Sequence, residues 1–163
     1  MPVKQLIPIE QEVNVKTQSG ANFSAVHTGR FDELGNNCTL VHPKLKRKVP
    51  GKMFVRELVA ATGMQISINS LAPRISTPFT HQHKENEETY VFIKGKGQML
   101  VDGDVIDVEE GSVVRISTKG SRCLRNTTDE PLHFICVQAK ENSLDQDTFD
   151  DGVPGDTPPT WPN

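Results

Sequence analysis

Residues 88–117 read ETYVFIKGKGQMLVDGDVIDVEEGSVVRIS, and this stretch decides the fold class. Short runs rich in valine, isoleucine and phenylalanine alternate with turn residues, and these runs are 88–94, 98–102, 105–108 and 112–117. Gly95-Lys96-Gly97 separates the first two runs, and Asp102-Gly103 strongly favours a two-residue hairpin turn. The stretch therefore predicts a series of short strands joined by tight turns.

The same pattern continues on both sides of this stretch, with further runs at 64–71, 121–125 and 132–139. Many short strands with turns about every 8–12 residues predict a sandwich or barrel, not a parallel sheet with crossover helices. We therefore predict an all-β fold whose barrel core spans residues 63–141. Residues 53–62 fit either a strand or a short helical turn.

The segments that flank the predicted core differ from it in composition. Residues 1–62 contain glycine and asparagine clusters, and we expect extension strands or an arm here that packs on the barrel. Residues 142–163 are acidic and proline-rich, so they contain too few apolar side chains for a core of their own. This tail is expected to wrap over the barrel or a neighbouring subunit, or to be disordered.

The composition of the 163 residues, 35% hydrophobic and 24% charged, is that of one ordinary globular domain. No run approaches the roughly 20 apolar residues that span a bilayer, and the N-terminal residues lack a secretory signal pattern. We therefore expect a cytoplasmic protein without membrane contact. Cys38, Cys123 and Cys136 include no C-x-x-C pair and predict neither a disulfide framework nor a thiolate zinc site.

The net charge of −3 argues against non-specific nucleic-acid binding. The one basic run, KLKRKVPGK at residues 44–52, could contact an anionic partner. A solvated loop or strand face is the more common form of such a run, and we interpret it in that way.

The segment that carries chemistry is residues 78–90, PFTHQHKENEETY. Side chains alternate along a strand, so His81 and His83 are expected to project from the same face as a pair of metal ligands. A turn then returns the chain, and an acidic residue of the next strand can add a carboxylate. Two histidines and one carboxylate leave positions open for water, dioxygen or substrate. The alternative is a polar strand end with two surface histidines.

This segment resembles the first motif of the cupin family, G-x5-H-x-H-x3,4-E-x6-G. The match runs from His81 and His83 through Glu88 to Gly95, whereas Ile75 stands where the motif opens with glycine. The spacing to Gly95 selects Glu88, not the acidic residue before it, as the metal-side carboxylate. The resemblance implies a double-stranded β-helix, or jelly roll, and a divalent manganese, iron, nickel or zinc ion on His81, His83 and Glu88.

The second cupin motif, G-x5-P-x-G-x2-H-x3-N, matches this chain only at its ends, Gly111 and Asn126. Arg122 stands where the motif has the histidine that usually supplies a fourth ligand. A guanidinium offers no lone pair to a metal, which leaves three alternatives. The ion is held by three ligands alone, or Arg122 lies over the open side and grips a carboxylate or phosphate. In the third alternative Arg122 forms an ion pair with Glu88 and fills the site without a metal.

Three other residues lie close to these motifs. Tyr90 shares the strand face of Glu88 and is expected to line the pocket with its hydroxyl inward. Cys123 is expected to be an outward or packed thiol, because the spacing to Asn126 places Arg122 inward. His133 is expected to be a hydrogen-bonded core or rim histidine, although it could also reach the site.

Two classes of function fit these residues. The first is a metal-dependent enzyme for a small polar or anionic molecule, either an isomerase or a dioxygenase. In an isomerase, Glu88 or a hydroxide on the metal is the candidate base and Arg122 the substrate clamp. The second is a module that binds a small ligand without turnover, which Arg122 favours. The chain also resembles small single-domain cupins of the sugar-phosphate (mannose-6-phosphate) isomerase-like kind, and the resemblance to cupins implies a homodimer.

Overall fold

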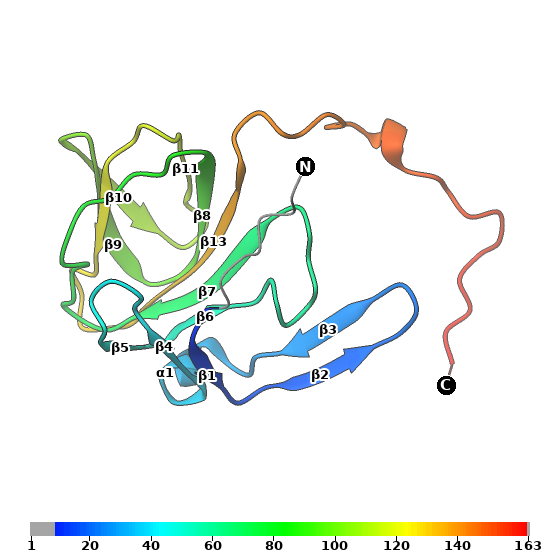
Figure 1. Cartoon of the computed structure of the whole chain (residues 1–163), viewed down its shortest axis with the longest axis horizontal. Helices are drawn as coiled ribbons and strands as arrows, with labels where there is room; N and C mark the ends of the chain where they lie inside the picture. The colour runs from blue at the N-terminus through cyan, green and yellow to red at the C-terminus, as the bar shows by residue number, and fades with distance from the viewer. Residues whose placement is uncertain (1–8, 163) are drawn as a thin grey trace.

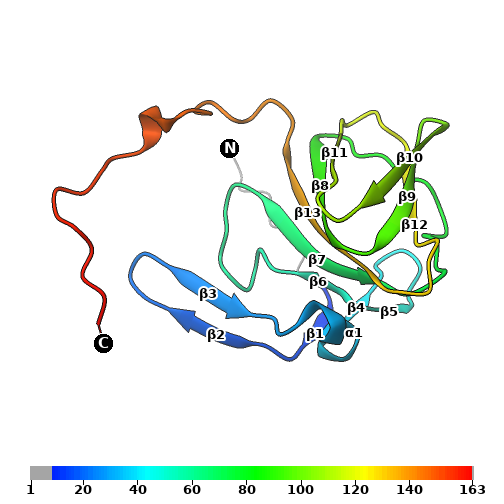
Figure 2. The same ribbon diagram turned by 180° about the vertical axis from the view of Figure 1, so that it is seen from behind.

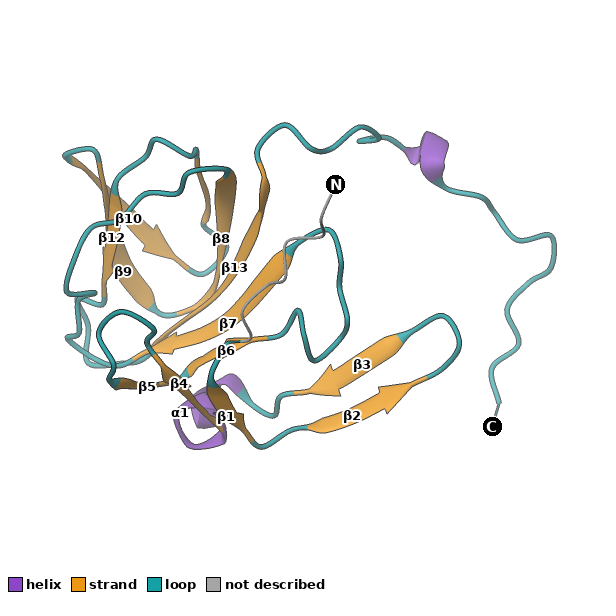
Figure 3. Cartoon of the chain, viewed as in Figure 1, coloured by secondary structure: helices purple, strands orange, loops and turns teal. Residues whose placement is uncertain are grey.

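The computed structural model describes residues 9–162, and strands make up nearly all the regular structure of this part of the chain (Figures 1 and 3). The predicted all-β fold is confirmed. In chain order the strands are β1 Gln11–Val13, β2 Lys16–Ser19, β3 Ser24–His27, β4 Cys38–Val41, β5 Lys48–Pro50, β6 Lys52–Phe54, β7 Gln65–Leu71, β8 Asn86–Lys94, β9 Lys96–Val101, β10 Asp104–Glu109, β11 Val113–Ile116, β12 Arg122–Arg125 and β13 Leu132–Lys140. The helical segments of residues 9–162 are α1 Leu34–Asn37 and the 3-10 turns η1 Phe31–Glu33 and η2 Phe149–Asp151. None of these segments has the length and apolar composition to cross a membrane.

Two antiparallel sheets form the barrel (Figure 1). The larger sheet has the strand order β11-β8-β13-β7-β6, and the smaller has the order β10-β9-β12. Phe134 on β13 pairs with Asn69 of β7 on one side and with Phe92 of β8 on the other. The strands from β7 to β13 correspond to the runs predicted from the sequence.

The barrel core follows the period-2 alternation of its strands. On β8, the buried side chains are Glu88, Tyr90 and Phe92. The apolar members of this core are Tyr90, Phe92, Met99, Val108, Ile116, Leu124, Leu132, Phe134 and Cys136. Because Glu88 continues the inward row of β8, its carboxylate lies in the barrel interior beside an aromatic core.

On β7, unlike on β8, the apolar side chains face away from the barrel and polar side chains face into it. Ile66 and Ile68 pack against a second core, whose buried members are Leu34, Cys38, Met53 and Val55. Ser67 and Asn69 are buried on the opposite face of the strand. The larger sheet therefore packs on the N-terminal elements through apolar residues of β7 and turns polar residues of the same strand toward the barrel.

The N-terminal strands form two small units beside the barrel (Figure 2). β1, β4 and β5 make a three-stranded sheet, whereas β2 and β3 form a hairpin that projects from the body. β6 lies within the residues predicted as an N-terminal arm, yet it pairs with β7 at the edge of the larger sheet. Beyond Lys140 the chain extends away from the barrel, and Trp161 is 84% exposed.

Gly95, between β8 and β9, has a φ of +91°, and a Cβ here would lie 2.5 Å from the carbonyl oxygen of Pro131. Replacing Gly95 with alanine is therefore expected to lower the free energy of unfolding by about 1–3 kcal/mol, measured by urea unfolding. Gly103 is the control, because it has a φ of +100° and an added Cβ would meet no atom within 4 Å. Gly103→Ala introduces only the backbone strain, so it should lower the free energy of unfolding by less than Gly95→Ala does. Equal losses in the two variants would contradict a role for the Pro131 contact.

Candidate functional site

His81, His83 and Glu88 come together at one end of β8, and one ligand atom from each lies within 4.8 Å of the others. The two histidines precede β8 in an irregular segment and do not form the strand predicted for them. His81 instead forms an isolated antiparallel β-bridge with Arg122. The backbone N–H of His81 donates to the carbonyl oxygen of Arg122 at 3.1 Å, and that of Arg122 donates to the carbonyl oxygen of His81 at 3.0 Å. The rings of His81 and His83 still lie side by side, with centroids 5.4 Å apart.

Both carboxylate oxygens of Glu88 are hydrogen-bonded, and the residue is only 5% exposed. His83 Nε2 lies 3.1 Å from Oε1, the Tyr90 hydroxyl donates to Oε2 at 2.7 Å, and Arg122 Nη2 also donates to Oε2. Burial alone would raise the pKa of Glu88. The hydrogen bonds from His83, Tyr90 and Arg122, with the Arg122 charge, outweigh burial and hold this pKa well below its usual range. Glu88 is therefore ionised at neutral pH.

Arg122 is 2% exposed and forms an ion pair with Glu88, as in the third alternative considered for it. Its Nη1 donates to the carbonyl oxygens of His81 at 3.3 Å and Gly120 at 3.2 Å. The ion pair uses Oε2 of Glu88, so Oε1 remains beside the histidines. Arg122 thus positions Glu88 in this structure, and its role as a substrate clamp stays a prediction.

The three side chains fit the ligand chemistry of a divalent transition metal. Desolvation of the ring and the positive charge of Arg122 lower the pKa of His81 to about 4, so its imidazole is neutral and keeps a free lone pair at neutral pH. Neutral imidazole and ionised carboxylate are the forms that bind such ions. His81 and His83 would supply nitrogen ligands, and Glu88 would supply Oε1.

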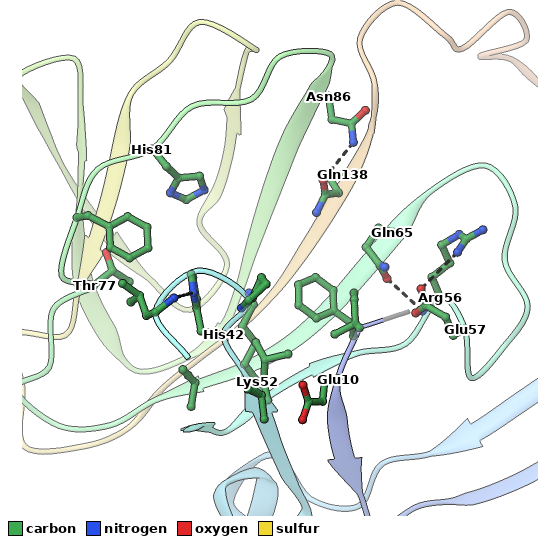
Figure 4. A pocket seen from close by; sticks show the side chains of 18 of the residues that line it. Glu10, His42, Lys52, Arg56, Glu57, Gln65, Thr77, His81, Asn86 and Gln138 are labelled. Carbon is green, nitrogen blue, oxygen red and sulfur yellow. Dashed lines mark hydrogen bonds and ion pairs between the residues drawn. The ribbon is translucent and has the colours of Figure 1, made fainter. Parts of the chain in front are cut away.

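Two cavities meet beside His81. A cleft of about 1030 Å³ is lined by residues of the N-terminal strands, the segment between β7 and β8, and the end of β13 (Figure 4). A smaller cavity of about 100 Å³ lies in the barrel interior against Tyr90 and Arg122. Lys52, Thr77 and His81 line both spaces and therefore mark their junction.

The cleft carries more basic than acidic side chains. The basic ones are Lys46, Arg47, Lys52, Arg56 and Lys140, and the acidic ones are Glu10 and Glu57. A concave surface with an excess of one sign of charge attracts molecules of the opposite sign. The lining of the cleft therefore has an excess of positive charge.

Two residues of this cleft, Lys52 and His42, were not predicted from the sequence as site residues. Lys52 ends the basic run 44–52, which we interpret from the sequence as solvated, but in the structure it is partly buried. The polar alternation of Ser67 and Asn69 on the neighbouring strand is the signal that could have identified it. His42 packs edge-on to Phe79, with ring centroids 5.7 Å apart.

The three residues expected near the motifs take defined places. The Tyr90 hydroxyl points inward to Glu88, as predicted. The thiol of Cys123 lies 3.0 Å from the Thr77 hydroxyl, so Cys123 is a packed thiol. His133 is 1% exposed, and its Nε2 lies 2.8 Å from Asp32 Oδ1. His133 is therefore a hydrogen-bonded core histidine outside the His81–His83–Glu88 cluster.

Comparison with curated proteins finds two partial relatives. An uncharacterized protein of Methanocaldococcus jannaschii is 26% identical over 97 residues, which are 60% of this chain and 66% of that protein. The glucose-6-phosphate isomerase of Pyrococcus abyssi is 34% identical over 74 residues, which are 42% of this chain and 39% of the isomerase. The chain thus spans less than two thirds of the length of either relative.

Solved structures and family models agree on one fold. A cupin protein from Bacteroides fragilis is 38% identical, with a TM-score of 0.62 over 64% of this chain and 88% of that one. A proposed sugar phosphate isomerase from Acidithiobacillus ferrooxidans shares the fold at 19% identity, with a TM-score of 0.51 over 55% of this chain and 58% of that one. The family model described as a cupin domain matches residues 68–138. With its jelly-roll barrel and its similarity to the Bacteroides protein, this chain belongs to the cupin superfamily.

Proposed function

We propose that the barrel binds a divalent transition metal ion through His81, His83 and Glu88, and a small polar or anionic molecule beside it. The proposal is carried by the convergence of the three ligand atoms within 4.8 Å of one another. One of the three residues, His81, lines both the cleft and the inner cavity. Two histidines and one carboxylate leave coordination positions open. A bound ion of this kind would polarise a carbonyl or hydroxyl oxygen of the molecule.

The residues around the proposed ligands fix the positions of these ligands through hydrogen bonds. Arg122 and Tyr90 bind Oε2 of Glu88 and thereby keep the carboxylate ionised, with Oε1 directed to His83. Arg122 also binds the backbone oxygen of His81, so one side chain connects two of the three ligand residues. Such preorganisation lowers the cost of ordering the ligands when they bind.

For the reaction, we propose isomerisation of a sugar phosphate. The proposal is supported by the basic cleft and by the similarity to the Pyrococcus isomerase, 34% identical over 74 residues. Isomerisation moves a proton between neighbouring carbon atoms and therefore needs a base of suitable pKa. The lowered pKa of Glu88 makes it a weak base, which supports a role as ligand over a role as base. The dioxygenase alternative and the homodimer stay predictions.

A metal-free module that binds a small ligand is the second candidate. The observation in its favour is the ion pair between Arg122 and Glu88, which already compensates the buried carboxylate without an ion. Measurement of bound metal separates the two candidates.

We expect near-stoichiometric metal in the purified chain by elemental analysis, and a fall to background in His81→Ala. Removal of one of three ligands leaves too few protein donors for tight binding. His81 lies in the irregular segment before β8 and outside both hydrophobic cores, so its truncation should leave the fold intact. His27→Ala, on β3 and outside the cleft, is the matched control and should keep its metal. A wild-type chain that takes up no manganese, iron, nickel or zinc would contradict the metal site and leave the metal-free module.

A further inference from the structure

Lys52 on β6 lines the same two cavities as His81 and belongs to a polar cluster with two residues of β7. Lys52 pairs with Asn69 in the β6–β7 ladder. Its Nζ donates to Asn69 Oδ1 at 3.0 Å and to Ser67 Oγ at 3.5 Å, and it lies 4.9 Å from the centroid of the Phe54 ring. Ser67 and Asn69 are 3% and 4% exposed. The ammonium group is therefore held by neutral oxygens and an aromatic face.

Asn69 is locked in the orientation that binds Lys52. Its Nδ2 donates to the backbone oxygen of Ser67 at 3.0 Å, to Ser67 Oγ at 3.1 Å and to the backbone oxygen of Phe134 at 3.4 Å. These three contacts leave the amide oxygen facing Lys52. The cluster thus fixes the position of the ammonium group on the barrel wall.

The charge of Lys52 has no carboxylate partner among residues 9–162. Arg122, the other cation of the inner cavity, is paired with Glu88. A cation withdrawn from water is costly unless an opposite charge compensates it. Burial accordingly lowers the pKa of Lys52. The charge of Glu88 acts on Lys52 from a distance, but Glu88 is already paired with Arg122. An anionic ligand would give Lys52 the direct partner that the described residues do not.

The position of Lys52 defines where such a ligand would lie. Lys52, Thr77 and His81 are the three residues that line both the cleft and the inner cavity. Figure 4 shows these three residues on the side of the cleft. A ligand that enters through the cleft and binds Lys52 therefore comes to rest beside His81. One end of the molecule would then be held by β6 and β7, and the rest would face the histidines.

We propose that Lys52, positioned by Asn69 and Ser67, is the anion-binding residue of the barrel and binds the terminal phosphate or carboxylate of the ligand. This inference rests on the proposed function, because it names the group that holds the same small molecule. It assigns the anion-binding role to a lysine on β6 of the larger sheet, in place of Arg122, which is paired with Glu88.

Inorganic phosphate and acetate, titrated into the full chain by calorimetry, test this subsite. We expect at least one of them to bind, and Lys52→Met to weaken that binding by about tenfold or more, since a hydrogen bond to a charged group is lost. Lys96→Met removes the same charge from an exposed position on β9 outside both cavities and should bind like the wild type. Phosphate binding alone would assign a phosphorylated ligand, and acetate binding alone a carboxylate.

A second readout distinguishes a ligand-binding lysine from a structural one. Without ligand, Lys52→Gln should melt at about the same temperature as the wild type, because it removes the cation and keeps a donor for the buried Asn69 oxygen. A structural lysine would instead cause a clear fall. If the methionine variant does not fold, Lys52→Gln keeps a donor for Asn69 and should lose anion binding in the same way.

These measurements distinguish a failure of the Lys52 proposal from a failure of the proposed function. Unchanged phosphate or acetate affinity in Lys52→Met would overturn the role of Lys52 and leave the proposed function in place. A wild-type chain that binds neither anion would overturn both the subsite and the anionic part of the proposed function. The metal content of the same preparation reports on the His81–His83–Glu88 site independently of either result.

Discussion

Replacing Arg122 with methionine is expected to lower the free energy of unfolding by about 3–5 kcal/mol, because it leaves the Glu88 carboxylate buried without its cation. For a chain of this length the loss corresponds to a fall in melting temperature of roughly 6–20 °C. Methionine keeps an unbranched apolar stem, so the variant mainly reports the lost charge and hydrogen bonds. Urea unfolding followed by circular dichroism measures the change.

Two further variants show whether the loss comes from the unpaired charge. Arg115 forms ion pairs with Glu87 and Glu141 on the surface. Arg115→Met should therefore lower the free energy of unfolding by less than about 1 kcal/mol. Combining Arg122→Met with Glu88→Met removes both buried charges and should recover much of the lost stability. A loss in Arg122→Met no larger than in Arg115→Met would contradict the importance of the buried pair.

Arg122→His is expected to raise the affinity for a divalent transition metal on the order of tenfold or more. The substitution removes a positive charge next to the site, and two like charges about 4 Å apart repel by about 4 kcal/mol at an intermediate dielectric. It also places an imidazole where the second cupin motif has its histidine. Titration with zinc or manganese by calorimetry measures the affinity. The melting temperature of the variant should also become metal-dependent.

The matched control for this prediction is Arg122→Met, which removes the charge without adding a donor atom. If both variants gain affinity equally, repulsion by Arg122 alone limits metal binding. A larger gain in Arg122→His shows that the new imidazole is a ligand. No gain in either variant would contradict the expectation that Arg122 weakens metal binding at His81, His83 and Glu88.

The division of charge inside the barrel links these experiments to function. Arg122 and Glu88 compensate each other, whereas Lys52 has neutral partners among the described residues. No carboxylate of the described residues therefore contacts Lys52, and an anionic ligand would give it a direct partner. A bound divalent cation would add a further attraction for the same anion. Metal and anionic ligand are accordingly expected to strengthen each other's binding.

The strands of the barrel were predictable because their signals are local. Alternating apolar residues and the turns at Gly95 and Asp102-Gly103 lie within a few residues of one another, and they specify short strands and hairpins. The grouping of His81, His83 and Glu88 was predictable for the same reason, since all three lie within eight residues of the chain. The irregular segment that carries both histidines, in place of a strand, was not, because its two bridges, Ser76 to Arg125 and His81 to Arg122, are to residues distant in the sequence.

Only the tertiary structure decided how the buried charges are paired. Sequence spacing left three roles open for Arg122, and its pairing with Glu88 depends on a contact between residues 34 positions apart. Lys52 reads as part of a solvated basic run until β6 adds to β7 and brings it against Asn69. Such contacts depend on which strands become neighbours and which faces turn inward. A buried charge takes whatever partner the assembled sheets provide, and no local pattern in the sequence specifies that partner.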